Sequence, residues 1–397
     1  MEKISNQTFN IKLTVVTPTF VGAGGDKDWK SGIDYIQKDG KIYVFDIEKM
    51  VALHLFSVNQ LAELLVKGGR KVADVLSPKM ESDFGNLERA LRYLPFDSPI
   101  DKETKTDIRS YEVKSFIRSQ FHDAPLIPGS SLKGAVRSIL FKYLRTGNDK
   151  EVDVFGNFRK GQDFMRFIQV GDTELAFLDR TGSTTVVLNT KVFNLDNKDR
   201  PWHGGWKHRG GKNGFTDDNF KPEDFNTLYE CAAPGASGSL VITLKKNAIT
   251  LLPDTPKTPL LYKDAKKDIL SDITKLFEIV NEHTREYLRK ELEFFKEYRT
   301  AARTEEIIAN IEDLIHRIPS DNSSCLLKMA AGSGFHSITG DWKYKDYYAD
   351  PGYWPKKDKN GNVIQGEPGK KKYKSRKIVE YNDKLSLMGF VELKVEK

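Results

Sequence analysis

The segment IPGSS at residues 127–131 constrains the fold most, because it must end one element and begin a helix. Proline stops the preceding element, and Ser130 or Ser131 is a suitable N-cap whose hydroxyl oxygen can accept a hydrogen bond from an amide of the first turn. Apolar residues then recur at helical spacing, and the stripe runs through residue 145: Leu132, Val136, Ile139 and Leu140. The segment therefore predicts a capped helix with one face packed against a core.

A half-buried strand is predicted ahead of this helix, because Phe9, Ile11, Leu13 and Val15 alternate with polar residues. The loop TPTFVGAGG follows it at residues 17–25. Residues 33–46 then predict a hairpin, since the Asp-Gly pair at 39–40 supplies the positive φ angles of a tight turn. Strand, hairpin and helix in this order are typical of a split βαβ unit, the ferredoxin-like arrangement.

The rest of the chain repeats this theme. Strands are predicted at residues 165–170, 184–193, 238–246, 324–330 and 387–395, and helices at 266–299 and 304–317. We therefore expect an α+β fold of two ferredoxin-like domains with inserted helices and basic loops. The first domain is predicted to span 1–160. The second is predicted to span 161–397, with long helices at 266–317 and a basic insert at 341–376.

The charge balance is mildly basic, since 63 Lys and Arg against 56 Asp and Glu give a net charge of +7. Such an excess is compatible with a polyanionic partner but does not identify one. Cys231 and Cys325 cannot form a disulfide framework and lack metal-ligand spacing, which favours a reducing compartment. The N-terminus shows no apolar signal segment, and no stretch approaches the ~18 apolar residues of a membrane span. We expect a soluble, cytoplasmic protein without membrane contact.

The predicted helix start is the first candidate binding site. Free amides and the helix dipole favour a phosphate group at such a position, and Lys133 and Arg137 add cations one turn further on. The predicted RNA contacts are Gly129, Ser130, Ser131, Lys133 and Arg137. The alternative is a capped helix that packs under a sheet and binds no ligand.

A second glycine-rich loop, AAGSGFHS at residues 330–337, follows a predicted strand. Such a loop lets the backbone approach a sugar-phosphate chain closely, which makes Gly332, Ser333, Gly334 and His336 candidate RNA contacts. A β-bulge or a tight turn is the alternative. The sequence has neither a G-x-G-x-x-G helix start nor a P-loop, and we expect no cofactor.

Two segments that look inserted combine cations with aromatic residues. Residues 198–213 carry five Lys or Arg against one acid, and residues 341–376 carry ten against five. Cations for phosphates and flat rings for unstacked bases are the ingredients of single-strand binding, so we predict RNA contacts at Trp202, Lys207, Arg209 and Lys212. A solvated loop is the alternative for both segments.

No metal site is predicted. Residues 358–369 start with calcium-loop spacing, but Val363 and Gly369 stand where glycine and glutamate are needed, so the segment predicts a hairpin turn instead. His203 and His208 have no nearby set of cysteines or carboxylates for zinc.

Several segments together carry a family resemblance: LTVVTPTFVGAGG, DYI, IPGSSLKGAVRSIL, VFGNF followed by VGDTEL, and GSGFHS, in that order. Over nearly its whole length the chain resembles the repeat-associated (RAMP) superfamily of CRISPR proteins. It looks most like the family of fifth subunits of type III-A Csm effector complexes. Gly22, Gly24 and Gly25 match the family's first-strand loop. The helix start at 129–137 and the glycine loop at 332–336 match its RNA-facing segments.

The resemblance implies a fold of two RNA-recognition-motif-like (RRM-like, RAMP) domains. It also implies a non-catalytic crRNA-binding subunit at the end of the backbone filament, where it covers the 3′ portion of the guide in antiviral defence. The implied partners are crRNA, the repeated RAMP backbone subunit and the small helical subunit. Family members are also implicated in crRNA 3′-end maturation through recruited host nucleases.

Two alternatives stay open. Related superfamily members cleave RNA, and Asp26, Asp28, His122 and His336 are the candidate residues for an endoribonuclease acting on crRNA or target RNA. No second acid or base has a fixed spacing to any of them, which favours a non-catalytic subunit. The other alternative is a protein-interaction scaffold without direct RNA contact, whose partner binding would respond less to salt than phosphate binding does.

Overall fold

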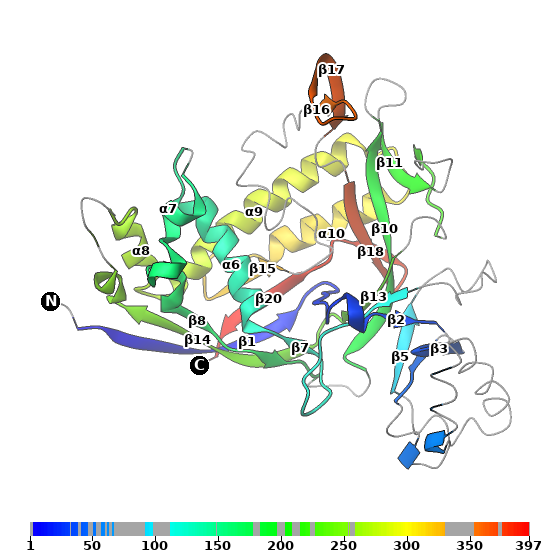
Figure 1. The fold of residues 1–397 in the computed structure, drawn as a ribbon, viewed down its shortest axis with the longest axis horizontal. Helices are drawn as coiled ribbons and strands as arrows, with labels where there is room; N and C mark the ends of the chain where they lie inside the picture. The colour runs from blue at the N-terminus through cyan, green and yellow to red at the C-terminus, as the bar shows by residue number, and fades with distance from the viewer. Residues whose placement is uncertain are drawn as a thin grey trace.

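The structure combines a five-stranded sheet, covered by helices on one face, with a larger branched sheet beside it (Figure 1). In this computed structural model the residues described are 3–31, 33–38, 41–46, 51–52, 57–59, 62, 66, 92–97, 112–147, 149–177, 183–196, 203–208, 215–222, 227–252, 254, 259–329, 353–371 and 375–396. Strands and helices alternate through these ranges, so the predicted α+β class is confirmed.

The five-stranded sheet has the strand order β15-β20-β1-β14-β8 and is antiparallel throughout. Alternation in the first strand has the predicted result, because Ile11, Leu13 and Val15 are buried while Asn10 and Lys12 face away from the core. The strands are β1 (Ser5–Val15), β8 (Ile168–Val170), β14 (Ser237–Lys246), β15 (Ser324–Lys328) and β20 (Phe390–Val395).

The helices on this sheet complete a ferredoxin-like arrangement. In chain order the elements run β1, α6, β8, β14, α9 and β15, and β20 inserts between the fourth strand and the first. Helix α10 packs beside α9 (Figure 1). The helices are α6 (Gly129–Leu144), α7 (Glu151–Phe155), α8 (Lys263–Ile269), α9 (Ile273–Glu297) and α10 (Thr304–Arg317).

Eleven of the described strands form the second sheet, and β10 is its centre. This strand pairs with β13, β18, β11 and β5. The strands are β2 (Trp29–Lys30), β3 (Tyr35–Lys38), β4 (Lys41–Val44), β5 (Arg92–Asp97), β6 (Glu112–Lys114), β10 (Thr185–Asp196), β11 (His203–His208), β12 (Phe215–Asp217), β13 (Thr227–Ala232), β18 (Ser375–Tyr381) and β19 (Lys384–Ser386).

Two smaller pairs lie outside both sheets. The strands β7 (Leu126–Ile127) and β9 (Thr173–Glu174) pair next to the start of α6. The strands β16 (Tyr353–Lys357) and β17 (Val363–Lys371) form a separate hairpin, which confirms the hairpin turn predicted at 358–369. In that turn the Asp358 carboxylate accepts hydrogen bonds from the amides of Asn360 and Asn362, both at 2.8 Å.

Three expectations about the elements need correction or comment. The predicted hairpin at 33–46 exists as β3 and β4, but it lies in the second sheet and not beside β1, so the split βαβ unit is β1–α6–β8. The predicted helix at 266–299 is two helices, because Asp272 caps a new start by accepting a hydrogen bond from the Thr274 amide at 3.2 Å. The five-stranded sheet takes β1 from the predicted domain 1–160 and its other four strands from the predicted domain 161–397.

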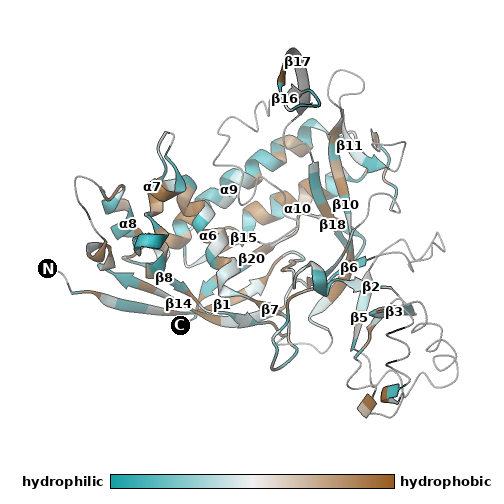
Figure 2. Ribbon diagram, viewed as in Figure 1, coloured by the Kyte–Doolittle hydropathy of each residue, from teal (hydrophilic) through white to brown (hydrophobic). Residues whose placement is uncertain are grey.

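Two apolar clusters hold these layers together. The larger one lies between the five-stranded sheet and helices α6 and α9, and includes Leu140 and Phe277. The other joins α9 and α10 to the second sheet through Phe193, Phe295 and Ile311. Figure 2 shows the corresponding apolar positions recurring along α9 and α10. The long helices are therefore shared by both sheets.

A group of buried charges sits where α9 meets the two sheets. The Arg376 guanidinium donates to the Glu291 carboxylate, at 3.1 Å through Nε and 3.3 Å through a terminal nitrogen. The Lys328 ammonium at the end of β15 lies 4.9 Å from the ring centre of Tyr287 and 4.8 Å from that of Phe390. Burial lowers the pKa of Lys328 from 10.5 to about 7, while Glu291 opposes the shift.

Stability is expected to rise with pH above 7 because of Lys328. The unfolded chain keeps the lysine proton up to about pH 10.5, whereas the folded chain releases it near pH 7. The free energy of unfolding therefore increases as pH rises between these values. One such group changes the free energy of unfolding by at most about 1.4 kcal/mol per pH unit. Urea unfolding of the native protein and of Lys328→Met across this range measures the effect. Equal pH slopes for the two proteins would refute the assignment.

Candidate nucleic-acid interface

Helix α6 begins two or three residues earlier than the sequence suggests. Its N-cap is Pro128, with no side-chain capping bond, so the prediction that Ser130 or Ser131 caps the helix is wrong. The reason is that β7 leads directly into Pro128, whose extended geometry places its carbonyl to accept hydrogen bonds from the amides of Ser131 at 2.9 Å and Leu132 at 3.3 Å. Both serines thus lie within the first helical turn.

The first amide of α6 is already occupied by a protein carboxylate. The Gly129 amide donates to Asp172 Oδ1 at 2.7 Å, so the prediction that this amide is free for a phosphate is wrong. Asp172 follows β8, and a negative charge there also satisfies the helix dipole. Gly129 is needed for this close approach, because a Cβ on it would lie 2.1 Å from the carbonyl oxygen of Val170.

The two predicted cations of this helix differ in their surroundings. Arg137 Nε donates to Glu151 at 2.7 Å, another of its nitrogens donates to Asp163 at 3.0 and 3.1 Å, and its guanidinium lies 4.3 Å from the ring centre of Phe155. Arg137 therefore joins α6 to α7 and carries a neutralised charge. Lys133 has no ion pair among the described residues, and its partial burial lowers the pKa of its ammonium. Lys133 is the cation at this helix start that an anion can approach.

The first glycine loop lies against the segment that leads into β7. Gly22 forms a β-bridge with Phe116, and the Ala23 amide donates to the carbonyl of Ser115 at 3.1 Å. Gly24 has a φ angle of 113°, which a residue with a side chain rarely adopts, and Gly25 opens the short 3-10 helix η1 (Gly25–Lys27). The three glycines are therefore held beside the 115–127 segment by backbone hydrogen bonds.

The 115–127 segment folds as a hairpin between this loop and α6. The Ile117 amide donates to the Val21 carbonyl at 2.9 Å, and the Leu126 amide donates to the Ile117 carbonyl at 3.0 Å. At its tip Phe121 is 92% exposed. The loop at 17–25, the hairpin at 115–127 and the start of α6 thus form one continuous surface, which we call the α6 surface.

A buried carboxylate fixes the base of this hairpin. Glu230 on β13 is fully buried and accepts hydrogen bonds from the Phe116 amide at 2.9 Å, from Arg92 at 2.8 Å and from Thr185 at 2.9 Å. Arg118 in the hairpin donates to the same carboxylate at 3.3 Å. The hairpin is therefore tied to the second sheet as well as to α6.

The segment that leads to the second glycine loop lies at the same end of the five-stranded sheet as the loop that follows β1. The Met329 amide donates to the Gly389 carbonyl at 2.7 Å, and the Gly389 amide donates to the Pro18 carbonyl at 2.9 Å. Gly389 has a φ angle of 90°, and a Cβ on it would lie 2.3 Å from the Met329 oxygen. The loops after β1 and β15 thus leave the sheet together. The candidate residues of the second loop lie outside the described residues: Gly332, Ser333, Gly334 and His336.

The basic inserts are only partly described. Lys207 lies half-buried on β11, while Trp202, Arg209 and Lys212 fall outside the described residues. The neighbouring Trp206 is buried, donates to the Ala302 carbonyl at 2.7 Å and packs on Phe193. This part of the 198–213 segment is a strand of the second sheet, and its aromatic residue belongs to the core.

The candidate catalytic residues do not converge. Asp28 is largely buried and pairs with Lys114 at 2.6 Å, while His122 at the hairpin tip lies 3.0 Å from Glu174. Asp26 lies exposed in η1, and His336 lies outside the described residues. Among the residues that the structure describes, no group of three or more His, Cys, Asp or Glu is placed to hold a metal ion. No described helix is long and apolar enough to cross a membrane.

Sequence reasoning missed Asp172, Glu230 and Phe121. The first two act on residues 43 and 114 positions away in the chain, at Gly129 and Phe116, and no local pattern reports such a contact. Phe121 lies in the polar stretch RSQFHD, where a lone aromatic residue between two turn-forming segments was the available signal.

Comparison with known proteins defines the class of this fold. The sequence model of the RAMP superfamily matches residues 12–342, and the chain belongs to that superfamily. A chain of the cryo-EM structure of a Csm–crRNA–target RNA ternary complex in a type III-A CRISPR-Cas system is similar in fold, with a TM-score of 0.58, 18% identity, and coverage of 98% of this chain and 100% of that one. The crystal structure of T. onnurineus Csm5 is similar with a TM-score of 0.56, 16% identity, and coverage of 96% and 99%. No curated protein matches the sequence.

Two glycines of α6 provide a matched test of its contact with β8. Gly129→Ala is expected to destabilise the protein by about 2–4 kcal/mol, because the new Cβ meets backbone that cannot move away easily. Gly134→Ala meets no atom within 4 Å in the same helix and is expected to leave stability unchanged or raise it by up to about 1 kcal/mol. Urea unfolding of both variants measures the difference. A Gly129→Ala protein as stable as Gly134→Ala would contradict the packing described here.

Proposed function

We propose that the chain is a non-catalytic, crRNA-binding subunit of a type III-A CRISPR effector complex. The observation that carries the proposal is the α6 surface, formed by three segments that are far apart in sequence, on a RAMP fold. The fold likeness adds support, because it extends over 98% of the chain to a component of a Csm–crRNA–target RNA complex.

The finer role that we propose follows the same likeness. The chain caps the backbone filament at the crRNA 3′ side, next to the repeated RAMP backbone subunit and the small helical subunit, and assists 3′-end maturation through host nucleases. Likeness to T. onnurineus Csm5 over 96% of the chain supports this position in a complex. The two alternative functions are an endoribonuclease and a protein-interaction scaffold without RNA contact, and the experiments below distinguish them from the proposed function.

Lys133 is the residue whose replacement tests RNA binding with least effect on the fold. Arg137 is unsuitable for this purpose, because its loss leaves Asp163 and Glu151 without their partner. Lys133→Gln is expected to weaken guide RNA binding and to reduce the slope of log affinity against log salt by about 1, as the loss of one phosphate contact does. Fluorescence anisotropy with labelled guide RNA over a salt series measures both quantities.

The matched control is Lys142→Gln at the other end of α6. Lys142 pairs with Glu286 on α9 at 3.0 Å, away from the helix start. RNA affinity of this variant should equal that of the native protein. If both variants bind RNA as the native chain does, or if binding does not respond to salt, the α6 surface is not an RNA site and the scaffold alternative gains.

The chain is also expected to lack intrinsic nuclease activity. Asp28 is neutralised by Lys114, and Asp26 belongs to no group of three or more His, Cys, Asp or Glu that could hold a metal ion among the described residues. Guide and target RNA incubated with the purified chain and Mg²⁺ should stay intact, and gel analysis of labelled RNA measures this. Cleavage that is lost in Asp26→Ala, His122→Ala or His336→Ala would overturn the non-catalytic assignment.

A further inference from the structure

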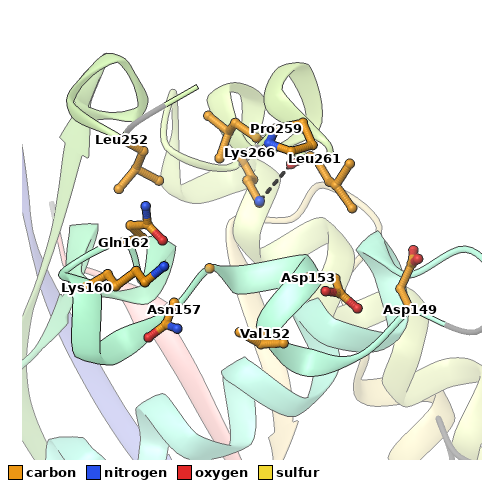
Figure 3. Close-up of a pocket in the computed structure, with 12 residues that line it drawn as sticks. Asp149, Val152, Asp153, Asn157, Lys160, Gln162, Leu252, Pro259, Leu261 and Lys266 are labelled. Carbon is orange, nitrogen blue, oxygen red and sulfur yellow. Dashed lines mark hydrogen bonds between the residues drawn. The ribbon is translucent and has the colours of Figure 1, made fainter. Parts of the chain in front are cut away.

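A cavity whose lining includes no residue of the α6 surface lies between α7 and α8. Its volume is about 340 Å³, within the range of sites for small organic ligands. The short helices η3 (Phe158–Lys160) and η6 (Ala248–Leu251) border it. Figure 3 shows the lining residues converging on this space from both sides: Asp149, Val152, Asp153, Gly156, Asn157, Lys160, Gln162, Leu252, Pro259, Leu260, Leu261 and Lys266.

Close backbone packing at Gly156 holds one wall of the cavity in place. Gly156, the glycine of the VFGNF motif, has a φ angle of 94°, and a Cβ on it would lie 2.3 Å from the Gln162 carbonyl oxygen. The Gln162 amide in turn donates to the Asn157 carbonyl at 3.1 Å. This close packing fixes one side of the cavity, because no residue with a side chain fits at Gly156.

One side of the cavity carries positive charge. Lys266 is fully buried in the wall, and its ammonium donates to the Leu261 carbonyl at 2.7 Å. Burial lowers the pKa of Lys266 to about 8, so the ammonium stays mainly protonated at neutral pH. Lys160 is exposed at the rim, and Figure 3 shows its amino group directed into the space below Lys266. Asp163 also lies near Lys266 and opposes this shift in its pKa, so an anion on this side of the cavity would contact the exposed Lys160 directly.

The opposite side carries acceptors. Asp149 accepts hydrogen bonds from the Tyr262 hydroxyl and the Thr146 amide, and Asp153 accepts one from the Lys150 amide at 2.9 Å. Each carboxylate keeps acceptor capacity for a further donor. Leu252, Pro259 and Val152 supply apolar surface between the two charged sides. The cavity therefore fits a ligand with an anionic group at one end, hydroxyl donors at the other and an apolar part.

The short helix η3, which supplies Lys160 to the lining, adds a feature that favours nucleic acid over other ligands of this kind. Phe158 in η3 is 80% exposed, and the exposed cations Arg159 and Lys160 follow it in the same turn. A ring beside cations suits a stacked base and its phosphate. An amino acid zwitterion also matches the charged sides, but it makes no use of this ring.

We propose that this cavity binds one nucleotide unit, with the phosphate between Lys160 and Lys266, the ribose hydroxyls donating to Asp153, and the base on the apolar wall. A neighbouring base would stack on Phe158. The nucleotide comes either free from solution or as the end of an RNA strand. The site is separate from the α6 surface, and it goes beyond the proposed function.

Calorimetric titration of the full chain tests the site. Uridine 5′-monophosphate should bind saturably, and Lys160→Gln should weaken it about tenfold, equivalent to about 1.4 kcal/mol. Lys245→Gln on β14, which is not among the residues that line the cavity, is the control and should bind normally. Uridine and inorganic phosphate should each bind more weakly than the nucleotide. Because these probes are single nucleotides, failure here leaves the guide RNA test with Lys133→Gln unaffected.

The dinucleotide pUpU separates the two sources. Tighter binding than uridine monophosphate, lost in Phe158→Ala, supports an RNA end, while equal binding of both ligands and no effect of Phe158→Ala supports a free nucleotide. No saturable binding, binding that Lys160→Gln leaves unchanged, phosphate bound as tightly as the nucleotide, or a Glu-Lys dipeptide bound in preference would each overturn the proposal.

Discussion

The junction at Gly389 is the contact on which the arrangement of the candidate interface depends. There the chain after β1 and the chain after β15 both contact the start of β20. The Met329 amide donates to the Gly389 carbonyl, and the Gly389 amide donates to the Pro18 carbonyl. The Thr17 hydroxyl also accepts a hydrogen bond from the Phe390 amide at 3.0 Å. Because β1 and β15 both run antiparallel to β20, their loops must emerge on the same side. The segments that follow β1 and β15 are more than 300 residues apart in the chain and are thereby brought to one end of the sheet.

At the start of α6, a protein carboxylate occupies the backbone amide to which an anion could otherwise bind. Asp172 already accepts the first amide, and Arg137 is held by Glu151 and Asp163. What remains for an anion is the exposed Ser130 and the half-buried ammonium of Lys133. Under the proposed function, the position of RNA on this surface would depend on the glycine loop and the hairpin as much as on the helix, because each supplies backbone at close range.

Periodicity in the sequence was sufficient for the fold class and for single elements. Alternation predicted β1, turn chemistry predicted the β3–β4 hairpin, and the apolar stripe predicted α10 at its observed bounds. Long-range partners were not predictable in this way: Pro128 became the N-cap because Asp172 and the β7–β9 pair hold the chain there. The composition of 198–213 suggested an RNA-binding loop, yet Trp206 packs in the core, since a single sequence does not show which face of a strand is covered. The RNA-contact role of the predicted site residues stays a prediction.

The central place of β1 has a consequence for how the protein is made. This strand precedes both of its neighbours in the sheet, β14 and β20, by a long stretch of chain. One edge of β1 therefore stays unpaired until β14 has been synthesised, and the other stays unpaired until β20 follows. Nascent chains of this topology depend on chaperones or on early contacts with α6 to keep an exposed β-edge from pairing with the wrong partner.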